Sequence, residues 1–284
     1  MYKIKIFSSF CNSDVCKINF EKVFNSWKYD FYGENKTIYI TTDDDYTHAI
    51  IINIAMPLLN IPKQNVIGLA FEPYELLNFT EEFINYAEKY IGKYLIGKNI
   101  NLPSLFIEKY AFLWHNNPNK SIPLTQKKKK MSIVFSNKNL APGHLYRIAL
   151  VREILNENLP IDIYGYGCAL IKNRGNYKNV KGKFYNEEPY EEYLFSICIE
   201  NYESNDYFSE KILDPLFYNC NPIYLGAKNI NKYFDNIICL KKKLLFDIEM
   251  VKVILKNPLK YYRQTYNERN ISKINFFENI LELF

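Results

Sequence analysis

A carboxylate and an amine stand side by side at the predicted start of a helix in the second half of the sequence. An apolar strand ends in Glu200 and Asn201, and after a polar loop Ser209 takes the position of a helix N-cap. Lys211 in the first turn adds a full positive charge to the unpaired N–H groups of the helix end, which suits a phosphate. Glu210 can accept hydrogen bonds from hydroxyl groups. The pair can therefore bind the phosphates and the ribose of one nucleotide.

Taken alone, a Glu-Lys pair is more often an ordinary solvated first turn of a helix. Asn201 and Tyr207 supply further polar groups near the pair. The longer pattern around the pair favours the binding site over the solvated turn.

Four short segments follow one another at fixed spacing: Glu200-Asn201, Tyr207, Ser209-Glu210-Lys211-Ile212 and Pro222-Ile223-Tyr224-Leu225-Gly226. This order resembles the signature of the α1,3-fucosyltransferases, glycosyltransferase family ten. The sequence departs from the signature at Ile199, Tyr202 and Ser209, where the family usually has Phe, Ser and Thr. Pro215 lies inside the predicted helix, and we expect a kink there that leaves the site end of the helix intact.

The resemblance implies an inverting transfer of L-fucose from GDP-fucose to a hydroxyl of an acceptor glycan. It assigns binding of the nucleotide sugar to Asn201, Tyr207, Glu210 and Lys211. Ser136-Asn137 with Arg147 downstream resembles the family's Ser-Asn turn and phosphate-binding arginine, although Arg147 could equally be an ordinary exposed helix residue. Because cations and a helix end would neutralise the leaving diphosphate, no metal or other cofactor is expected.

A second candidate carboxylate follows a strand in the first half. Residues 67–71 form an apolar run that ends in Glu72, and open sheets place ligand-facing residues at that end of a strand. The resemblance implies an acidic general base here, with Glu72 the best match and Glu75 the second candidate. A surface glutamate before a turn set by Pro73 is the alternative.

Asp43-Asp44-Asp45 contains the D-x-D pattern that holds a metal in the other large glycosyltransferase fold. There the pattern follows a complete nucleotide-binding unit, whereas here it follows only two strands. We therefore predict a solvated turn.

The composition fits a globular protein of two domains. The chain has 284 residues, 48% of them hydrophobic, and a net charge of +5 that is spread along the sequence apart from lysine runs at 127–130 and 241–243. This distribution does not indicate a nucleic-acid partner, and the lysines at 127–130 are expected to be solvated. The six cysteines form no metal-ligand pattern, so reduced and mostly buried thiols are expected.

The apolar run at 48–61 is too short and interrupted for a transmembrane segment, and the N-terminus reads as a strand instead of a signal peptide. We therefore expect a soluble, cytoplasmic protein of bacterial or virus-encoded type.

Strand and helix patterns alternate along the chain. Strands are predicted at 3–7, 37–41, 49–54, 66–71, 94–96, 132–136, 161–164 and 195–199, and helices at 80–91, 144–156 and 261–284. The predicted class is α/β and GT-B-like, with two Rossmann-type domains facing across a cleft. We assign 1–120 to an acceptor-side domain, 121–260 to the nucleotide-sugar domain and 261–284 to a C-terminal helix packing back on the first domain. Residues 116–123 read as the linker.

Two other functions stay open. The first is a GT-B transferase with a different nucleotide sugar, because the Glu-Lys pair selects ribose and phosphate better than it selects the hexose. The second is a catalytically silent sugar-binding module. The sequence does not specify the acceptor glycan, the linkage or the oligomeric state.

Overall fold

The computed structural model describes residues 1–117, 122–172, 174–185, 187–263 and 268–284. The predicted linker lies partly outside these ranges. The chain divides into two compact units: unit 1 comprises Met1–Asn117, Ser204–Tyr207 and Ile271–Phe284, and unit 2 comprises Pro118–Glu203 and Phe208–Asn270. Each unit is built around one parallel sheet of six strands.

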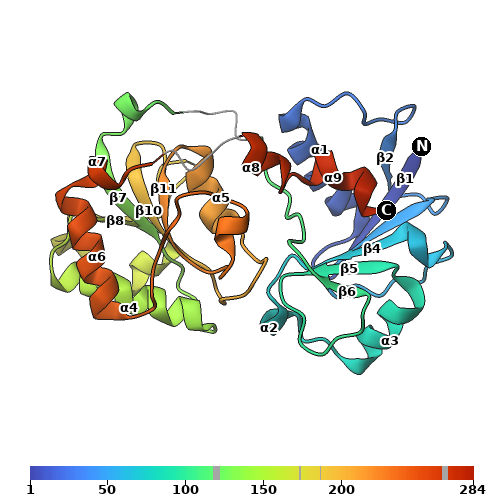
Figure 1. Cartoon of the computed structure of the whole chain (residues 1–284), viewed down its shortest axis with the longest axis horizontal. Helices are drawn as coiled ribbons and strands as arrows, with labels where there is room; N and C mark the ends of the chain where they lie inside the picture. Colours follow the sequence, from blue (N-terminus) through green and yellow to red (C-terminus); the bar gives the residue numbers. More distant parts are fainter. Residues whose placement is uncertain (118–121, 173, 186, 264–267) are drawn as a thin grey trace. The chain divides into compact units, whose positions relative to one another are not determined.

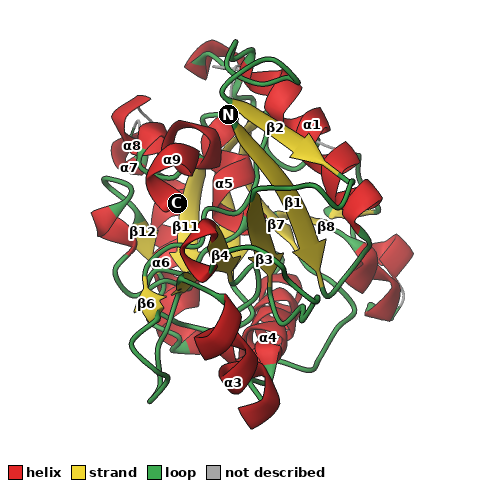
Figure 2. Cartoon of the chain, turned by 90° about the vertical axis from the view of Figure 1, so that its right-hand side faces the viewer, coloured by secondary structure: helices red, strands yellow, loops and turns green. Residues whose placement is uncertain are grey.

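The sheet of unit 1 has the strand order β2-β1-β3-β4-β5-β6, and every neighbouring pair is parallel (Figures 1 and 2). The five predicted strands are present, and β6 is an additional short one. Apolar residues run almost without interruption through the inner strands, as expected where helices cover both faces. The strands are β1 (Tyr2–Ser8), β2 (Ile38–Thr41), β3 (His48–Ile52), β4 (Val66–Leu69), β5 (Lys93–Ile96) and β6 (Phe106–Glu108).

Unit 1 contains α1 (Ser13–Trp27), α2 (Tyr74–Leu77), α3 (Glu81–Tyr90) and α9 (Phe276–Leu283). The predicted helix at 80–91 is α3, capped by Thr80. Sequence analysis missed α1, although its buried face repeats at helical spacing through Cys16, Phe20 and Phe24. The rings of Phe20 and Phe277 lie 5.2 Å apart, so α9 packs against α1 (Figure 1).

The prediction of one helix over residues 261–284 is wrong. The described part of this segment contains the end of α7 (Pro258–Tyr261), then α8 (Glu268–Ser272) and α9. Asn275 starts α9 afresh, because its side-chain oxygen accepts a hydrogen bond from the backbone N–H of Phe277 at 2.9 Å. A cap of this kind interrupts the apolar pattern that suggested a continuous helix.

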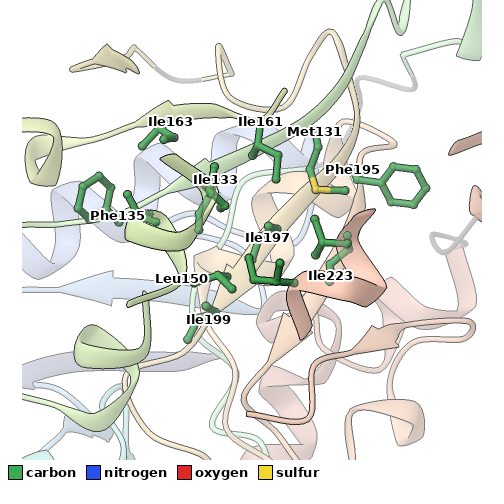
Figure 3. Packing of buried hydrophobic residues seen from close by; sticks show 14 of the residues in the cluster. Met131, Ile133, Phe135, Leu150, Ile161, Ile163, Phe195, Ile197, Ile199 and Ile223 are labelled. Carbon is green, nitrogen blue, oxygen red and sulfur yellow. The ribbon is translucent and has the colours of Figure 1, made fainter. Parts of the chain in front are cut away.

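The sheet of unit 2 has the order β12-β11-β10-β7-β8-β9, again parallel throughout. Every residue of β10 is buried, and Phe195, Ile197 and Ile199 form the centre of the core shown in Figure 3. The strands are β7 (Lys129–Val134), β8 (Asp162–Tyr164), β9 (Val180–Gly182), β10 (Tyr193–Ile199), β11 (Asn221–Leu225) and β12 (Ile238–Cys239), and the longer helices are α4 (Pro142–Asn156), α5 (Glu210–Phe217) and α6 (Leu244–Lys256).

The prediction that the lysines at 127–130 are solvated is wrong for Lys127. Lys127 is 9% exposed, and its Nζ donates hydrogen bonds to the backbone oxygens of Tyr190, at 3.1 Å, and Tyr218. These carbonyls compensate the desolvated ammonium. Lys129 pairs with Glu192 at 2.9 Å. Lys127 therefore belongs to the edge of the core, whereas Lys128 and Lys130 are exposed, as predicted.

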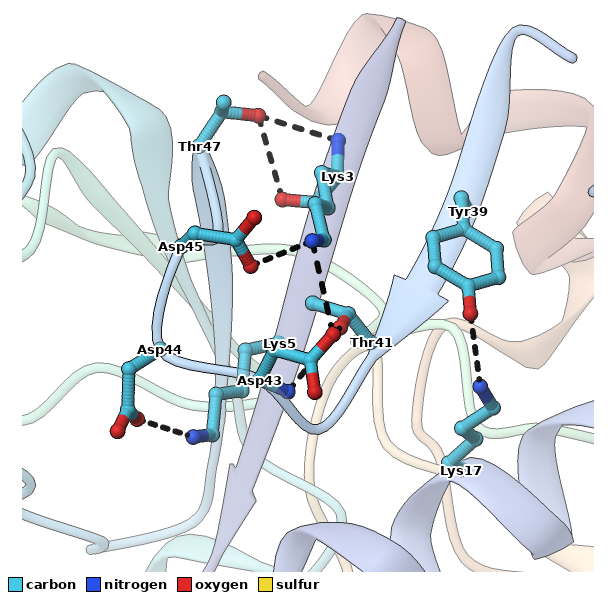
Figure 4. A network of polar contacts seen from close by, with 9 residues as sticks. All are labelled: Lys3, Lys5, Lys17, Tyr39, Thr41, Asp43, Asp44, Asp45 and Thr47. Carbon is cyan, nitrogen blue, oxygen red and sulfur yellow. Dashed lines mark hydrogen bonds and ion pairs between the residues drawn. The ribbon is translucent and has the colours of Figure 1, made fainter. Parts of the chain in front are cut away.

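The acidic turn at Asp43-Asp44-Asp45 faces two lysines of β1 (Figure 4). Asp44 pairs with Lys5 at 2.8 Å, and Lys3 contacts both Asp45 and Asp43, the latter at 3.6 Å. The three carboxylates are 69–100% exposed, in keeping with the predicted solvated turn. Their charges are directed at protein cations of the neighbouring strand.

Candidate active site

Glu200 anchors the first turn of α5 to the end of β10. The backbone N–H of Glu200 still pairs with Leu225 at 2.8 Å, while its side chain is buried. One carboxylate oxygen accepts a hydrogen bond from the N–H of Ser209 at 2.9 Å, and the other accepts one from the Ser209 hydroxyl at 2.8 Å. Ser209 is the N-cap of α5, as predicted. Sequence analysis included Glu200 in the motif but gave it no role, although a lone charge ending an apolar strand was the signal.

Two glycines allow other segments to approach Glu200. A Cβ on Gly143 would lie 1.8 Å from the backbone oxygen of Glu200, and a Cβ on Gly226 would lie 2.5 Å from its Cγ. The N–H of Gly143 also donates to the backbone oxygen of Asn201 at 3.0 Å. A larger residue at Gly143 would displace backbone, and one at Gly226 would displace the side chains of Glu200 and Tyr224. The start of α4 is therefore held directly against the end of β10.

Lys211 lies among oxygen atoms of the same cluster. Its Nζ donates to the Ser209 hydroxyl and to Glu210, both at 3.0 Å, and lies 3.5 Å from the Glu200 carboxylate. Burial works against the charged form, but the carboxylates of Glu200 and Glu210 outweigh it and raise the pKa of Lys211. The Glu210 side chain is 64% exposed, so it is accessible to a ligand hydroxyl.

Arg147 on α4 is buried, which excludes the alternative of an ordinary exposed helix residue. Its Nη2 donates to the side-chain oxygen of Asn201 at 3.1 Å, whereas its Nε has no hydrogen-bond partner among the residues that the structure describes. Burial lowers the pKa of the guanidinium and nearby carboxylates oppose this shift, but an arginine stays protonated at neutral pH. A buried cation with an unused donor is prepared to bind an anion.

Asp214 is an additional titratable group on α5, one turn after Glu210. Burial raises the pKa of Asp214 to about 7, and the negative charge of Glu210 adds to the shift. Pro215, which follows it, lies in the last turn of α5, so the first turn keeps its normal cap.

The predicted site residues fall into two sets. Arg147, Asn201, Glu210 and Lys211 all belong to unit 2, where contacts of α4, α5 and the end of β10 join them. Tyr207 belongs to unit 1 and is 4% exposed. A Cβ on Gly97 would lie 2.5 Å from its Cβ. The structure therefore assembles four of the five predicted donor residues within one unit.

Glu72 follows β4 in a loop fixed by buried contacts of unit 1. The N–H of the preceding Phe71 donates to the Asn53 side chain at 2.8 Å, and the hydroxyl of Tyr94 donates to the Asn53 backbone oxygen at 2.9 Å. Glu72 is half-buried. The second candidate, Glu75, is on α2 and pairs with Lys98 at 3.0 Å.

A pocket of about 440 Å³ lies within unit 1 beside Phe71. Phe10 follows β1 and Phe71 follows β4, so both mark the carboxyl edge of the same parallel sheet. The rings of Phe71 and Trp114 meet edge to face, 5.4 Å apart. The complete lining is Phe10, Asn19, Lys22, Val23, Phe71, Leu113, Trp114 and Asn116. Aromatic walls with a few amide and cationic groups are typical of small-ligand sites.

Within the described ranges, no group of three or more His, Cys, Asp or Glu residues is arranged as ligands around a metal ion. No helix in the same ranges combines the length and the apolar character required to cross a bilayer.

The fold is GT-B-like, with two Rossmann-like domains. An α1,3-fucosyltransferase crystallised with GDP-fucose superposes with a TM-score of 0.57 at 17% identity, covering 100% of this chain and 89% of that one. The same enzyme type with GDP gives 0.56 at 16%, over 99% and 90% of the two chains. A DNA-modifying β-glucosyltransferase gives 0.52 at 14%, over 99% of both chains. At these identities the likeness establishes the fold.

The sequence comparisons point to one family. Residues 124–238 match the family described as glycosyltransferase family 10 (fucosyltransferase), C-term. A fucosyltransferase-like protein of Arabidopsis thaliana is 28% identical over 123 residues, which is 41% of this chain and 22% of the length of that relative. The GT-B-like fold predicted from the sequence is confirmed, and the match over residues 124–238 agrees with the predicted family. The roles of the individual site residues stay predictions.

The different burial of two glutamates predicts different effects on stability. Glu200→Gln removes an acceptor from the Ser209 N–H or hydroxyl, so the free energy of unfolding should fall by about 1–3 kcal/mol, the cost of an unsatisfied buried group. Glu210→Gln changes an exposed side chain and should stay within about 0.5 kcal/mol of wild type. Urea unfolding followed by circular dichroism measures both. Equal losses would show that Glu200 does not anchor α5.

Proposed function

We propose that the protein is an inverting fucosyltransferase that moves L-fucose from GDP-fucose to a hydroxyl of an acceptor glycan. The observation that carries the proposal is the assembly of two cations around the end of β10. Arg147 reaches Asn201 from α4, and Lys211 reaches Ser209 from the first turn of α5. The family match over the same residues supports fucose as the sugar.

The donor diphosphate is proposed to lie against Lys211, Arg147 and the N–H groups at the start of α5. Two full positive charges match the two negative charges of a diphosphate diester, and they stabilise the additional charge that develops on the leaving GDP. Glu210 is placed to accept hydrogen bonds from the ribose hydroxyls. With this charge complement, we propose that transfer requires no metal.

The chemistry proposed is a single displacement. The acceptor oxygen forms a bond to the anomeric carbon of fucose while the bond from that carbon to the diphosphate oxygen breaks and its electrons leave with GDP. The hydroxyl proton passes to a carboxylate of unit 1, for which Glu72 is the first candidate. Glu72 is preferred because it lies at the carboxyl edge of the sheet, next to Phe71 of the aromatic pocket.

The aromatic pocket of unit 1 is the proposed acceptor subsite. Phe10, Phe71 and Trp114 offer ring surfaces for the apolar face of a sugar, and Asn19 and Asn116 offer amide groups for its hydroxyls. The pocket begins at the residue before Glu72, so an acceptor bound there approaches the proposed base. This aromatic pocket differs in chemical character from the proposed donor site of unit 2, where charged groups dominate.

A related transferase with another nucleotide sugar is the second candidate, because Glu210 and Lys211 are matched to ribose and phosphate instead of the hexose. A thermal-shift comparison of GDP-fucose with GDP-mannose, UDP-glucose and UDP-galactose distinguishes the two. The largest increase in Tm should come from GDP-fucose.

Removal of the Lys211 charge should weaken donor binding. Lys211→Ala is expected to lower the affinity for GDP by roughly 1.5–3 kcal/mol, the scale of a charge-assisted hydrogen bond. Titration calorimetry measures the change, and addition of EDTA should leave the wild-type affinity unaltered. Lys138→Ala, in the loop after β7, is a control for the loss of a nearby charge and should have the smaller effect. Unchanged affinity in Lys211→Ala, or loss of wild-type binding in EDTA, would contradict the assignment.

Glu72→Gln tests the base. Glutamine keeps the shape of the side chain but cannot accept the proton, so kcat should fall by roughly 10²-fold or more while GDP-fucose affinity stays near wild type. Glu75→Gln is the matched control and should retain turnover. The reverse pattern would make Glu75 the base, and two active variants would place the base outside this segment.

Phe10→Ala tests the acceptor pocket. Phe10 is 64% exposed, so its truncation should not destabilise the fold, but loss of a ring surface should raise KM for the acceptor roughly tenfold with donor affinity unchanged. The acceptor is first identified by GDP release on a glycan array. Phe246→Ala removes a ring of similar exposure, 55%, from α6 in unit 2 and should leave KM unaltered. Equal KM values for the acceptor in wild type, Phe10→Ala and Phe246→Ala would show that the acceptor does not bind in this pocket.

A further inference from the structure

The aromatic pocket of unit 1 has one charged residue in its wall. Among the described residues that line it, Lys22 carries an ammonium group, and Asn19 and Asn116 carry amides. The remaining lining residues are apolar, and none of those in the described ranges is a carboxylate. A ligand in the pocket therefore meets a positive charge that the wall itself does not balance.

α1 places two of the three polar groups side by side. Asn19 and Lys22 are three residues apart on this helix, and residues at that spacing are neighbours on a helix surface. Both side chains are exposed, as is that of Asn116. In the part of the chain that the structure describes, none of the three side chains has a hydrogen-bond or ion-pair partner. All three are available to a ligand.

The carboxylate nearest to Lys22 in the sequence is engaged with other groups. Glu21 accepts a hydrogen bond from the Tyr32 hydroxyl at 2.5 Å and lies 3.8 Å from the ammonium of Lys17. A hydroxyl and a second lysine therefore compensate the charge of Glu21. The charge of Lys22 is left for the pocket.

Two hydrogen bonds hold the wall segment 113–116 against α1. The indole N–H of Trp27 donates to the backbone oxygen of His115 at 2.9 Å, and the N–H of Asn117 donates to the Ser26 hydroxyl at 2.8 Å. Trp27 and Ser26 both belong to α1. The backbones that carry the polar groups are therefore positioned before a ligand binds, which lowers the cost of ordering the site.

A carboxylated sugar matches these groups better than a neutral one. An ammonium group donates three hydrogen bonds and accepts none, and a carboxylate only accepts, so the two are complementary. The hydroxyls of a neutral sugar would leave the charge of Lys22 unpaired. In a hexuronic acid the carboxylate replaces the hydroxymethyl group at the edge of the ring. The apolar face of the same sugar can therefore still pack against an aromatic side chain.

We propose that the acceptor glycan contains a hexuronic acid and that Lys22 binds its carboxylate, with Asn19 supplying a neighbouring amide. The inference rests on the proposed function, since it takes this pocket to be the acceptor subsite. Lys22 lies on α1, whereas Phe71 follows β4 and precedes Glu72, the proposed base. The carboxylate and the reacting hydroxyl of the acceptor are therefore assigned to different elements of the wall. Lys22 selects the acceptor and takes no part in the bond changes of the transfer.

The test compares three sugars that differ at one carbon: methyl glucoside, methyl glucuronide and methyl glucoside sulfated at the same carbon. Each is titrated into the full chain, and ligand-observed NMR measures the weak affinities expected of single sugars. Wild type should bind the glucuronide roughly tenfold more tightly than the glucoside, the scale of one charge-assisted hydrogen bond. The preference should fall as the salt concentration rises, because ions screen an exposed pair.

Variants of Lys22 assign the preference to its charge. Lys22→Gln should bind the glucuronide and the glucoside equally, Lys22→Glu should reverse the preference because like charges repel, and Lys22→Arg should retain it. Lys17→Gln is the matched control, since it removes an equal charge from α1 outside the pocket and should keep the preference of wild type. Lys22 is exposed, so its variants should keep the fold, which circular dichroism verifies.

GDP release from GDP-fucose on a glycan array tests the same preference in the reaction. Acceptors that contain a hexuronic acid should give the higher kcat/KM. Lys22→Gln should lower this value roughly tenfold through KM, with kcat near wild type, because the lost interaction is present before and during the transfer.

Equal binding of the glucuronide and the glucoside by wild type, or a preference that persists in Lys22→Gln, would overturn the inference. Tightest binding of the sulfated glucoside would overturn the assignment to a carboxylate. Transfer to neutral glycans alone would refute the inference and leave the proposed function intact. Absence of GDP release with every glycan would refute the proposed function and with it the role of the sugar as acceptor. The titrations distinguish these cases because they need no turnover.

Discussion

The proposed donor site depends on the hydrogen bonds and the ion pair of the buried Glu200 carboxylate. Burial of a charge is costly unless hydrogen bonds and an opposite charge compensate it, and here Ser209 supplies two hydrogen bonds while Lys211 lies 3.5 Å away. The same residue holds the cap of α5 through its side chain and receives α4 through its backbone, because Gly143 has no Cβ. Two helix ends from distant parts of the sequence are thereby fixed at one point.

That arrangement leaves positive charge available in the free protein. Within the described ranges the Nε of Arg147 has no hydrogen-bond partner, and carboxylates raise the pKa of Lys211 despite its burial. Donors fixed in advance by the fold need little reorganisation when an anion binds or when negative charge develops during the reaction. Sequence identity to the fucosyltransferases of known structure is low. The site is therefore argued from the contacts of this chain and not from those of its structural neighbours.

The candidate site residues of unit 1 differ in chemical character from those of unit 2. Its candidate base follows a loop fixed by Asn53, and its pocket is walled mainly by rings instead of charges. Tyr94 is buried in the same sheet. Its ring lies against Gly68, where a side chain would not fit, and its hydroxyl donates a hydrogen bond to the backbone oxygen of Asn53. The division fits a protein that handles a diphosphate donor and a partly apolar acceptor on separate domains.

The sequence by itself determined the features that depend on neighbouring residues. The N-cap at Ser209, the buried strand before Glu200 and the family signature could be read directly, because capping and burial periodicity are short-range properties. Only the tertiary structure decided which polar groups meet across the sequence. It buried Arg147 and Lys127, gave Glu200 its partners and divided the C-terminal segment into separate helices. These outcomes depend on desolvation and on contacts between residues up to about a hundred positions apart, which no local pattern records.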